Sequence, residues 1–460
     1  MDAGGLLRDT AERAITYLEG LDDRPVHATA TLEDLRQALH GPLPEGPVDP
    51  AAVVAELAEA AAGGVVGTMS PRYFGFVIGG SQPAALAADW LVSAWDQNAG
   101  LYVGGPAVSV MEEVAAAWLT DLLALPADAS VGFVTGCQMA HFTALAAARH
   151  HELAQVGWDV EERGLGGAPP VRVLVGAHRH VTVDRALRYL GFGTANIEVV
   201  AADAGSRMDT AALDRTLAVR PPGPTIVCAQ VGEVNTGAID PVGEISRIAH
   251  DHGAWVHVDG AFGLWAAASP TLRPLVAGVG HADSWATDAH KWLNVPYDSG
   301  LAFCAHPQAH RAAMCASAAY LERDERDPRE QMDWNPEFSR RARGVPVYAA
   351  LRALGRSGVA DLVDRCCRHA RRFADALRRE PGVRVLNDVV LNQVLVSFHG
   401  DVPTEDVVRR AQREGTCWLS GTTWHGRAAM RISVCNWQTT TDDVDRSLAA
   451  ILRAARPVSA

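Results

Sequence analysis

A strand, helix and strand succession between residues 225 and 259 constrains the fold more than any other part of the chain. Residues 225–231 and 255–258 are apolar runs of strand length. Residues 241–252 between them have helical spacing, with proline at the start and Gly253 just past the end. Two strands joined by a helix lie parallel in one sheet, with a right-handed crossover. We therefore expect an α/β fold built on a mostly parallel sheet.

Further strands are predicted at residues 131–134, 171–175 and 282–286. In an open parallel sheet, ligands bind beyond the carboxyl ends of the strands. Side chains that follow these strands are therefore candidate functional residues. They are the glycine turn Thr135-Gly-Cys-Gln138, His180, Asp259 and Lys291.

Lys291 stands directly after His290 at the end of an apolar segment. Lysine is almost never fully buried unless it is paired or used chemically. The obvious chemical use is a Schiff base with a carbonyl cofactor. Taken alone, however, the His-Lys pair favours a partly exposed structural lysine.

The turn at residues 135–138 joins a short strand to an alanine-rich helix that runs to about His151. Free backbone N–H groups and the helix dipole both face such a turn, which makes it a candidate phosphate site. It is not a Walker A loop, because no Gly-Lys-Ser/Thr follows. Without other support, a turn of this kind is more often a packing device.

Composition narrows the functional classes. The 460 residues fit one large α/β domain with additions, and the net charge of −13 argues against nucleic acid as a partner. No stretch approaches the roughly 18 apolar residues of a membrane span, and the first 20 residues lack a signal-peptide core. The eight cysteines include no Cys-x-x-Cys pair, so we expect reduced thiols, a cytoplasmic protein and no metal site. His178 and His180 could bind a metal, but no third ligand has suitable spacing.

Three segments follow from these patterns. Residues 1–68 are predicted to form an N-terminal helical arm that packs on a partner subunit, residues 69–355 the large domain, and residues 356–460 a small C-terminal α/β domain. Residues 70–80 form an aromatic, glycine-broken loop that is either a pocket wall or a plain packing turn. Residues 313–345 are charged and irregular, which suggests a mobile surface loop or lid.

The order of these motifs resembles the group II pyridoxal-dependent decarboxylases, the family of aromatic-L-amino-acid and glutamate decarboxylases. The resemblance lies in Thr135-Gly-Cys-Gln138, His180, His257-Val-Asp259-Gly-Ala261 and His290-Lys-Trp292. It implies the type I aminotransferase fold, pyridoxal 5'-phosphate (PLP) as cofactor, and a homodimer with shared active sites. It also implies an amino acid as the substrate and a place in amino-acid metabolism.

The resemblance assigns three catalytic residues. Lys291 would hold the cofactor as the internal aldimine, Asp259 would keep the pyridine nitrogen protonated, and His180 would stack on the ring opposite Ala261. The backbone of Gly136, Cys137 and Gln138 would bind the phosphate, with Asn235, Ser284 and His290 as further contributors. The substrate contacts would be Phe76, Val77 and Ile78, together with Leu101 and Tyr102 from the partner subunit.

The implied reaction is α-decarboxylation of an L-amino acid through an external aldimine and a quinonoid. One departure bears on its outcome: residues 321–338 contain no tyrosine, and Gln331 or a neighbour stands where aromatic decarboxylases carry the tyrosine that protonates the substrate carbon. The alternatives are aldehyde-forming oxidative deamination coupled to decarboxylation, or side-chain cleavage by retro-aldol reaction or β-elimination. A catalytically silent PLP-binding protein is a non-enzyme alternative, and the intact Lys291 and Asp259 count against it.

Overall fold

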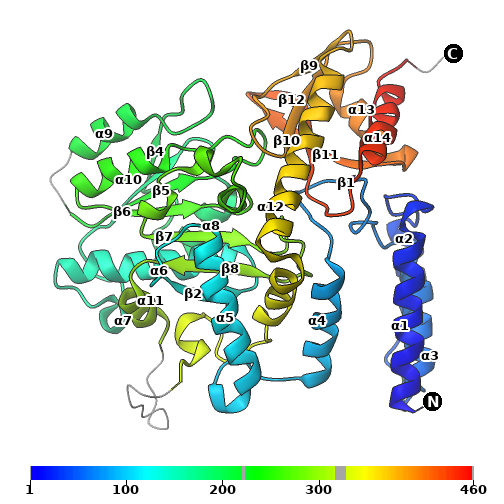
Figure 1. The fold of residues 1–460 in the computed structure, drawn as a ribbon, viewed down its shortest axis with the longest axis horizontal. Coiled ribbons are helices and arrows are strands. Elements are labelled where there is room, and N and C mark those ends of the chain that lie inside the picture. The colour runs from blue at the N-terminus through cyan, green and yellow to red at the C-terminus, as the bar shows by residue number, and fades with distance from the viewer. Residues whose placement is uncertain (1, 220–222, 316–327, 458–460) are drawn as a thin grey trace.

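The computed structural model describes residues 2–219, 223–315 and 328–457. They form a helical N-terminal arm, a large domain around a seven-stranded sheet, and a smaller domain around a five-stranded sheet (Figure 1). This arrangement confirms the predicted α/β class, with a mostly parallel main sheet and a small C-terminal domain.

The arm consists of α1 (Ala3–Glu19), α2 (Leu32–Leu39) and α3 (Pro50–Ala61). Each helix begins after a residue whose side chain caps the first turn: Asp2, Thr31 and Asp49. No side chain of the three helices is buried, and α1 and α3 stand apart from the body of the molecule (Figure 1). No apolar side chain on these three helices is therefore buried in the single chain.

The main sheet has the strand order β2-β8-β7-β6-β5-β3-β4. β8 runs antiparallel to both of its neighbours, and the other described pairs are parallel. The sequence predicts five of these strands within a few residues and misses β4 and β8. The bounds are β2 (Ser130–Val134), β3 (Arg172–Gly176), β4 (Ile197–Val200), β5 (Thr225–Gln230), β6 (Trp255–Asp259), β7 (Ser284–Asp288) and β8 (Gly300–Cys304).

Helices cover the sheet on both sides (Figure 1). One of them, α6, begins at the predicted phosphate turn and packs against β6, β7 and β8. The large-domain helices are α4 (Pro83–Trp95), α5 (Pro106–Leu122), α6 (Cys137–Gln155), α7 (Val160–Arg163), α8 (Val181–Tyr189), α9 (Thr210–Ala218), α10 (Val242–Asp251) and α11 (Pro307–Met314).

The smaller sheet has the order β1-β11-β12-β10-β9. Its edge strand β1 pairs in parallel with β11, so residues 73–74 join the C-terminal sheet although they lie within the range predicted for the large domain. The elements are β1 (Tyr73–Phe74), β9 (Val383–Val385), β10 (Gln393–Phe398), β11 (Trp418–Trp424), β12 (Arg427–Ser433), α13 (Thr404–Glu414) and α14 (Thr441–Ala454).

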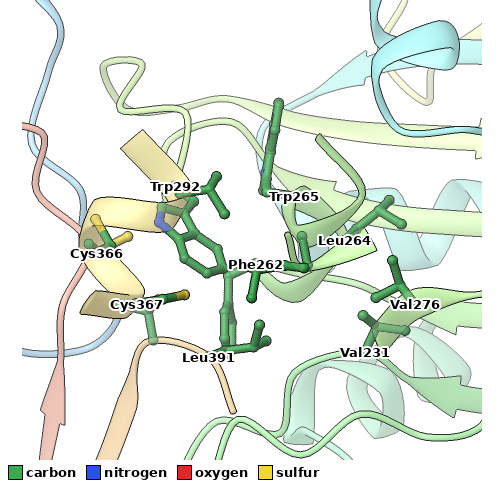
Figure 2. Close-up of a cluster of buried hydrophobic side chains, with 14 of the residues drawn as sticks. Val231, Phe262, Leu264, Trp265, Val276, Trp292, Cys366, Cys367 and Leu391 are labelled. Carbon is green, nitrogen blue, oxygen red and sulfur yellow. The ribbon is translucent and has the colours of Figure 1, made fainter. Parts of the chain in front are cut away.

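The two domains are joined by α12 (Gly344–Leu377), which breaks at Gly355, where φ is 62°. The predicted boundary between residues 355 and 356 falls at this break. An apolar cluster spans both domains: Figure 2 shows Trp292 between Phe262 on one side and Cys366 and Cys367 of α12 on the other. The residue after Lys291 is therefore anchored in the core that joins the domains.

The charged segment predicted at residues 313–345 is described only in part, because residues 316–327 lie outside the described ranges. Its later part contains the 3-10 helix η6 (Gln331–Trp334) and, near its end, Arg340. Arg340 donates two hydrogen bonds to Glu112, at 2.9 and 3.0 Å, and both side chains are fully buried. This end of the segment is therefore fixed to α5, in contrast to the mobile loop expected from its charge.

Two further features concern the whole described chain. Seven cysteines are buried free thiols, at positions 137, 228, 304, 366, 367, 417 and 435. None of the helices in the described ranges combines the length and apolar character needed to cross a lipid bilayer.

Candidate active site

One face of β6 and β7 carries a column of polar side chains. Successive residues of a strand point to opposite faces, so Trp255, His257 and Asp259 share one face of β6, and Ser284, Ala286 and Asp288 share the adjacent face of β7. The helix α6 covers this face. The column ends at the carboxyl ends of the strands, where Asp259 and Asp288 lie close to Lys291.

Lys291 forms an ion pair with a residue that the sequence did not reveal. Its Nζ lies 3.0 Å from Oδ2 of Asp288, and only 19% of the lysine side chain is exposed. Burial alone lowers the pKa of this ammonium, but the negative charge of Asp288, with a smaller contribution from Cys137, outweighs burial and raises the pKa above its ordinary value. The lysine is therefore held as a charged ammonium beside a buried carboxylate.

Asp288 also closes the predicted phosphate turn. Its Oδ1 accepts a hydrogen bond of 2.6 Å from the backbone N–H of Cys137, the first residue of α6, and lies 3.3 Å from Nε2 of His290. Burial alone raises the pKa of the Asp288 carboxyl, but Lys291 and His290 together lower it below its ordinary value. A carboxylate thus occupies the N-terminus of α6, where an anion is favoured.

The backbone around Lys291 is fixed by Asn294. The side-chain amide of Asn294 donates to the carbonyls of Lys291, Trp292 and Cys435, at 3.2, 2.9 and 3.0 Å. Its Oδ1 accepts from the N–H of Trp437 at 2.8 Å. A single side chain therefore connects the lysine loop with the segment that follows β12.

The loop at residues 75–80 packs directly on this lysine. A Cβ at Gly79 would lie 1.9 Å from the carbonyl oxygen of Lys291, so only glycine fits there. Phe76 and Val77 both have left-handed backbone angles, φ 53° and 60°, a conformation that costs energy for such residues. The structure thus brings the predicted substrate loop, Phe76 to Ile78, to the neighbourhood of Lys291.

Leu101 and Tyr102 do not join this group within one chain. They lie in the turn between α4 and α5, where both helices reach their lower ends in Figure 1. The N–H of Tyr102 donates to Glu330 of the charged segment. Their predicted role depends on a second subunit.

The predicted phosphate turn has the shape of a cradle. Gly136 and Gly300 touch so closely that a Cβ at Gly300 would lie 2.4 Å from the Gly136 backbone. A Cβ at Gly136 would lie 3.2 Å from the His290 ring and 3.5 Å from Asp288 Oδ1. The amide of Gln138 has buried oxygen and nitrogen atoms with no hydrogen-bond partner among the described residues. An unsatisfied amide at a helix N-terminus fits a missing polar ligand.

His180 caps the N-terminus of α8 and lies near the polar column. Its Nδ1 accepts from the N–H of Thr182 and contacts the Thr182 hydroxyl at 2.8 Å, so the proton of the neutral ring is on Nε2. Burial lowers the pKa of His180, while Asp259 acts in the opposite direction. The N–H of Ala261 donates to Asp259 Oδ1 at 3.1 Å. Ala261 also packs against the small apolar cluster that contains Cys137.

Two predicted phosphate contributors have other contacts. Ser284 is fully buried, and its hydroxyl contacts Nε1 of Trp255 and Nδ1 of His257, each at 2.9 Å. It therefore lies at the far end of β7 from Asp288, and the structure does not bring it to the cradle. The amide of Asn235 donates to Glu233 and accepts from Thr422.

A second residue that the sequence analysis missed is Arg431 of β12. It is 8% exposed, and its side chain forms no hydrogen bond or ion pair with any residue in the described ranges. Burial lowers the pKa of its guanidinium, an effect opposed by Glu233, and its charge reaches His180. A buried cation without a partner is costly unless a ligand supplies the counter-charge.

The family model that matches this chain is described as the pyridoxal-dependent decarboxylase conserved domain, and it spans residues 33–399. The chain belongs to this decarboxylase family. An aromatic-L-amino-acid decarboxylase of Bacillus atrophaeus is 26% identical over 466 residues, which cover 97% of this chain and 94% of that protein. An L-2,4-diaminobutyrate decarboxylase of Rhizobium meliloti (strain 1021) is 30% identical, covering 81% of this chain and 75% of the relative.

The fold agrees with this assignment. The crystal structure of Oryza sativa TDC with PLP and tryptamine superposes with a TM-score of 0.91 at 23% identity, covering 99% of this chain and 98% of that one. The decarboxylase is therefore a PLP-dependent carboxy-lyase with the type I aminotransferase fold, and it removes the α-carboxylate of an L-amino acid.

The residues present fit this cofactor. The unsatisfied Gln138 amide and the glycine-lined turn suit a phosphate. Asp259 ends β6, and Lys291 lies just beyond the end of the adjacent strand β7. When bound, PLP supplies an electrophilic aldehyde carbon and a protonated ring that takes up the electron pair left by carbon dioxide. The described residues of the decarboxylase thus suit both the phosphate and the ring of PLP.

Proposed function

We propose that Lys291 Nζ bonds the cofactor aldehyde and that Asp259 holds the ring nitrogen in its protonated form. The phosphate would be held by Gly136, Cys137 and Gln138, with His290 at the rim of the turn. His180 would lie on the ring face opposite Ala261. A buried carboxylate favours the charged pyridinium, which is the form that accepts electrons.

The substrate's α-carboxylate is held by Arg431 in this proposal. The supporting observation is the buried guanidinium without a described partner, close enough to His180 to lower the pKa of that imidazole. A planar guanidinium binds a carboxylate with two parallel hydrogen bonds. The bond between the α-carbon and the carboxylate, which the reaction breaks, would then be held in a fixed position beside the His180 ring.

The experiment compares binding of an amino acid with binding of its amine product. The amine lacks the carboxylate, so Arg431→Met should weaken binding of the amino acid by roughly 10–100-fold and leave the amine unaffected. Arg431→Lys should lie between the two, because lysine keeps the charge but not the paired geometry. Spectral titration of the holoenzyme with each ligand measures both constants. Equal losses for amino acid and amine would show that Arg431 only supports the fold.

We further propose an apolar or aromatic side chain for the substrate. Phe76 packs on Trp418 with ring centroids 5.2 Å apart, and Trp418 stacks on Tyr73 at 5.1 Å. Phe76 belongs to the loop that covers Lys291, and Tyr73 and Trp418 come from the neighbouring strands β1 and β11. A screen of the common L-amino acids for carbon dioxide release identifies the substrate class, and a clear preference for charged side chains would contradict the proposal.

An aldehyde-forming reaction is a second candidate, favoured by the absence of tyrosine from residues 321–338. Gln331, which with its neighbours is the predicted counterpart, is buried in η6, and its Oε1 has no partner among the described residues. Without an acid to protonate the substrate carbon, oxygen could oxidise it instead. An assay that measures amine, aldehyde and hydrogen peroxide together separates the outcomes, and it also detects side-chain cleavage. We favour the amine, because the Nε2–H of His180 is available as a proton donor.

We propose that the protein is a cytoplasmic homodimer. Apolar side chains are exposed on the arm and on the neighbouring helices, and exposed clusters of this kind mark contact surfaces. They are Leu7 and Ile15 of α1, Val53 and Leu57 of α3, Trp90, Leu91 and Trp95 of α4, and Val110 of α5. Sedimentation of the holoenzyme should give twice the chain mass of 48.9 kDa, whereas a stable monomer would contradict the shared-site proposal.

A further inference from the structure

A hydrogen-bonded chain of buried side chains leads from the interior of the sheet to His141, whose ring lies beside Asp259. It begins at Trp255 Nε1, which donates to Ser284 Oγ at 2.9 Å, and continues from Ser284 Oγ to His257 Nδ1 at 2.9 Å. His257 Nε2 then lies 2.9 Å from His141 Nδ1. His141 Nε2 ends the chain, 3.6 Å from Asp259 Oδ1 and 3.4 Å from Cys137 Sγ.

The direction of this chain follows from the chemistry of its first member. An indole nitrogen can only donate, so the Ser284 oxygen accepts from Trp255. The hydroxyl proton of Ser284 has one described acceptor, Nδ1 of His257. His257 Nδ1 is therefore unprotonated, and a neutral His257 carries its proton on Nε2, directed at His141.

The same reasoning passes to the second imidazole. His141 Nδ1 must accept from His257, so the neutral ring of His141 carries its proton on Nε2. Both rings are fully buried, and burial lowers the pKa of each, which keeps them neutral. If His257 Nδ1 instead donated to Ser284, the hydroxyl proton of Ser284 would be buried without an acceptor, which costs free energy.

We propose that His141 is a positioning residue for the cofactor's electron sink: the Trp255–Ser284–His257 chain fixes its tautomer so that Nε2–H faces Asp259. This N–H faces Oδ1 of the Asp259 carboxylate and so orients it, leaving the other oxygen for the ring nitrogen of PLP. The inference rests on the proposed role of Asp259 as the partner of that nitrogen.

The arrangement also bears on metal binding. Cys137, His141 and Asp259 place a sulfur, a nitrogen and an oxygen within 4.8 Å of one another, which is close enough for a shared metal ion. A metal would need the lone pair of His141 Nε2, but the hydrogen-bonded chain puts a proton there. Within the described residues, we therefore interpret this group as a hydrogen-bonded cluster that serves Asp259.

The test measures the dissociation constant of PLP from the apoenzyme for matched variants. His141→Leu removes the donor and should weaken PLP binding roughly tenfold or more. His141→Gln returns an N–H at a similar position and should restore binding to within about threefold of the wild type. The control is His310→Leu, because His310 is equally buried but contacts Ser130 and Trp334, away from this group. It should leave PLP binding unchanged.

A second measurement covers the case in which His141→Leu does not fold. Ring nitrogen NMR of histidine-labelled wild-type holoenzyme, assigned with the glutamine variant, should show His141 and His257 both protonated at Nε2. In Ser284→Ala, which removes the donor to His257, this single tautomer should be lost. A proton on Nδ1 of His141 in the wild type would overturn the proposal, and so would unchanged PLP binding by a folded His141→Leu. Failure of the wild type to bind PLP would instead contradict the proposed function.

Discussion

Asp288 Oδ2 lies 3.0 Å from Lys291 Nζ, while Asp288 Oδ1 accepts the N–H of Cys137 at the start of α6. One carboxylate therefore connects the lysine that we assign to the cofactor aldehyde with the turn that we assign to its phosphate. Because the pair raises the pKa of the Lys291 ammonium, it also sets how much of the reactive neutral amine exists at a given pH.

We predict that Asp288→Asn accelerates the reaction of the apoenzyme with PLP. In the wild type the raised pKa keeps Lys291 protonated, so the rate should rise with pH throughout the neutral and mildly alkaline range. Removing the carboxylate lowers that pKa, and the neutral amine increases about tenfold for each unit of the shift. The rate at pH 7, followed by visible absorbance, should therefore increase at least tenfold, with the pH profile displaced to lower pH.

The control for this prediction is pyridoxal, which lacks the phosphate. Asp288→Asn also removes a negative charge from the phosphate turn, and this change alone would accelerate PLP but not pyridoxal. An acceleration seen with both aldehydes supports the effect on Lys291. One restricted to PLP would contradict it and assign Asp288 to the turn alone.

Replacing Asn294 should destabilise both the fold and the lysine loop. Asn294→Gly keeps the left-handed backbone, φ 56°, but loses the bonds to Lys291, Trp292 and Cys435, at an expected cost of about 2–4 kcal/mol. Asn294→Ala adds the strain of a left-handed alanine, about 1 kcal/mol more. Urea unfolding at fixed PLP concentration measures both, with exposed Asn196→Ala as the control. A cost below about 0.5 kcal/mol for the glycine variant would show that the amide does not secure this loop.

Glu152 should lower the free energy of unfolding at alkaline pH but not at acid pH, when the wild type is compared with a variant that is neutral at this position. Burial raises the pKa of its carboxyl to about 7, so ionisation is unfavourable in the folded state. The penalty is absent below the unfolded pKa of about 4.3, grows as pH rises and is complete above about pH 7. Glu152→Gln keeps an acceptor for the Thr225 N–H and should gain up to about 3 kcal/mol at pH 8.

The gain from Glu152→Gln should shrink to nearly zero below about pH 4. Urea unfolding from about pH 4 to about pH 8 checks the sign, with exposed Glu162→Gln as a control expected to change stability by less than about 0.5 kcal/mol. A gain that is constant with pH would contradict the assignment to ionisation of Glu152.

The central strands and the residues at their ends could be predicted because their signals are local. Asp259 and Lys291 each follow an apolar run, and the helix at residues 241–252 has proline at its start and glycine past its end. The strand β8 was missed because Gly300–Cys304 is a short run that directly follows the lysine loop. Its antiparallel place between β2 and β7 is decided by partners far away in the sequence.

Ser284 shows where such reasoning reaches its limit. The resemblance places Ser284 at the phosphate. This serine shares a face of β7 with Asp288, but four residues of strand separate the two by about 13 Å. Arg431 and His141 had no local signal. Arg431 of β12 lies near His180, and His141 of α6 lies near Asp259. Their roles depend on tertiary packing, which brings a cation and an imidazole to a site assembled from other segments.

The most direct test of the account measures carbon dioxide released from the common L-amino acids by the PLP-loaded protein and by Lys291→Ala. We predict release from at least one amino acid by the wild type, together with a visible absorbance of bound cofactor. Both should be lost in Lys291→Ala, which removes the amine that bonds the cofactor. No release from any amino acid by the wild type, or an unchanged spectrum and rate in Lys291→Ala, would contradict the account.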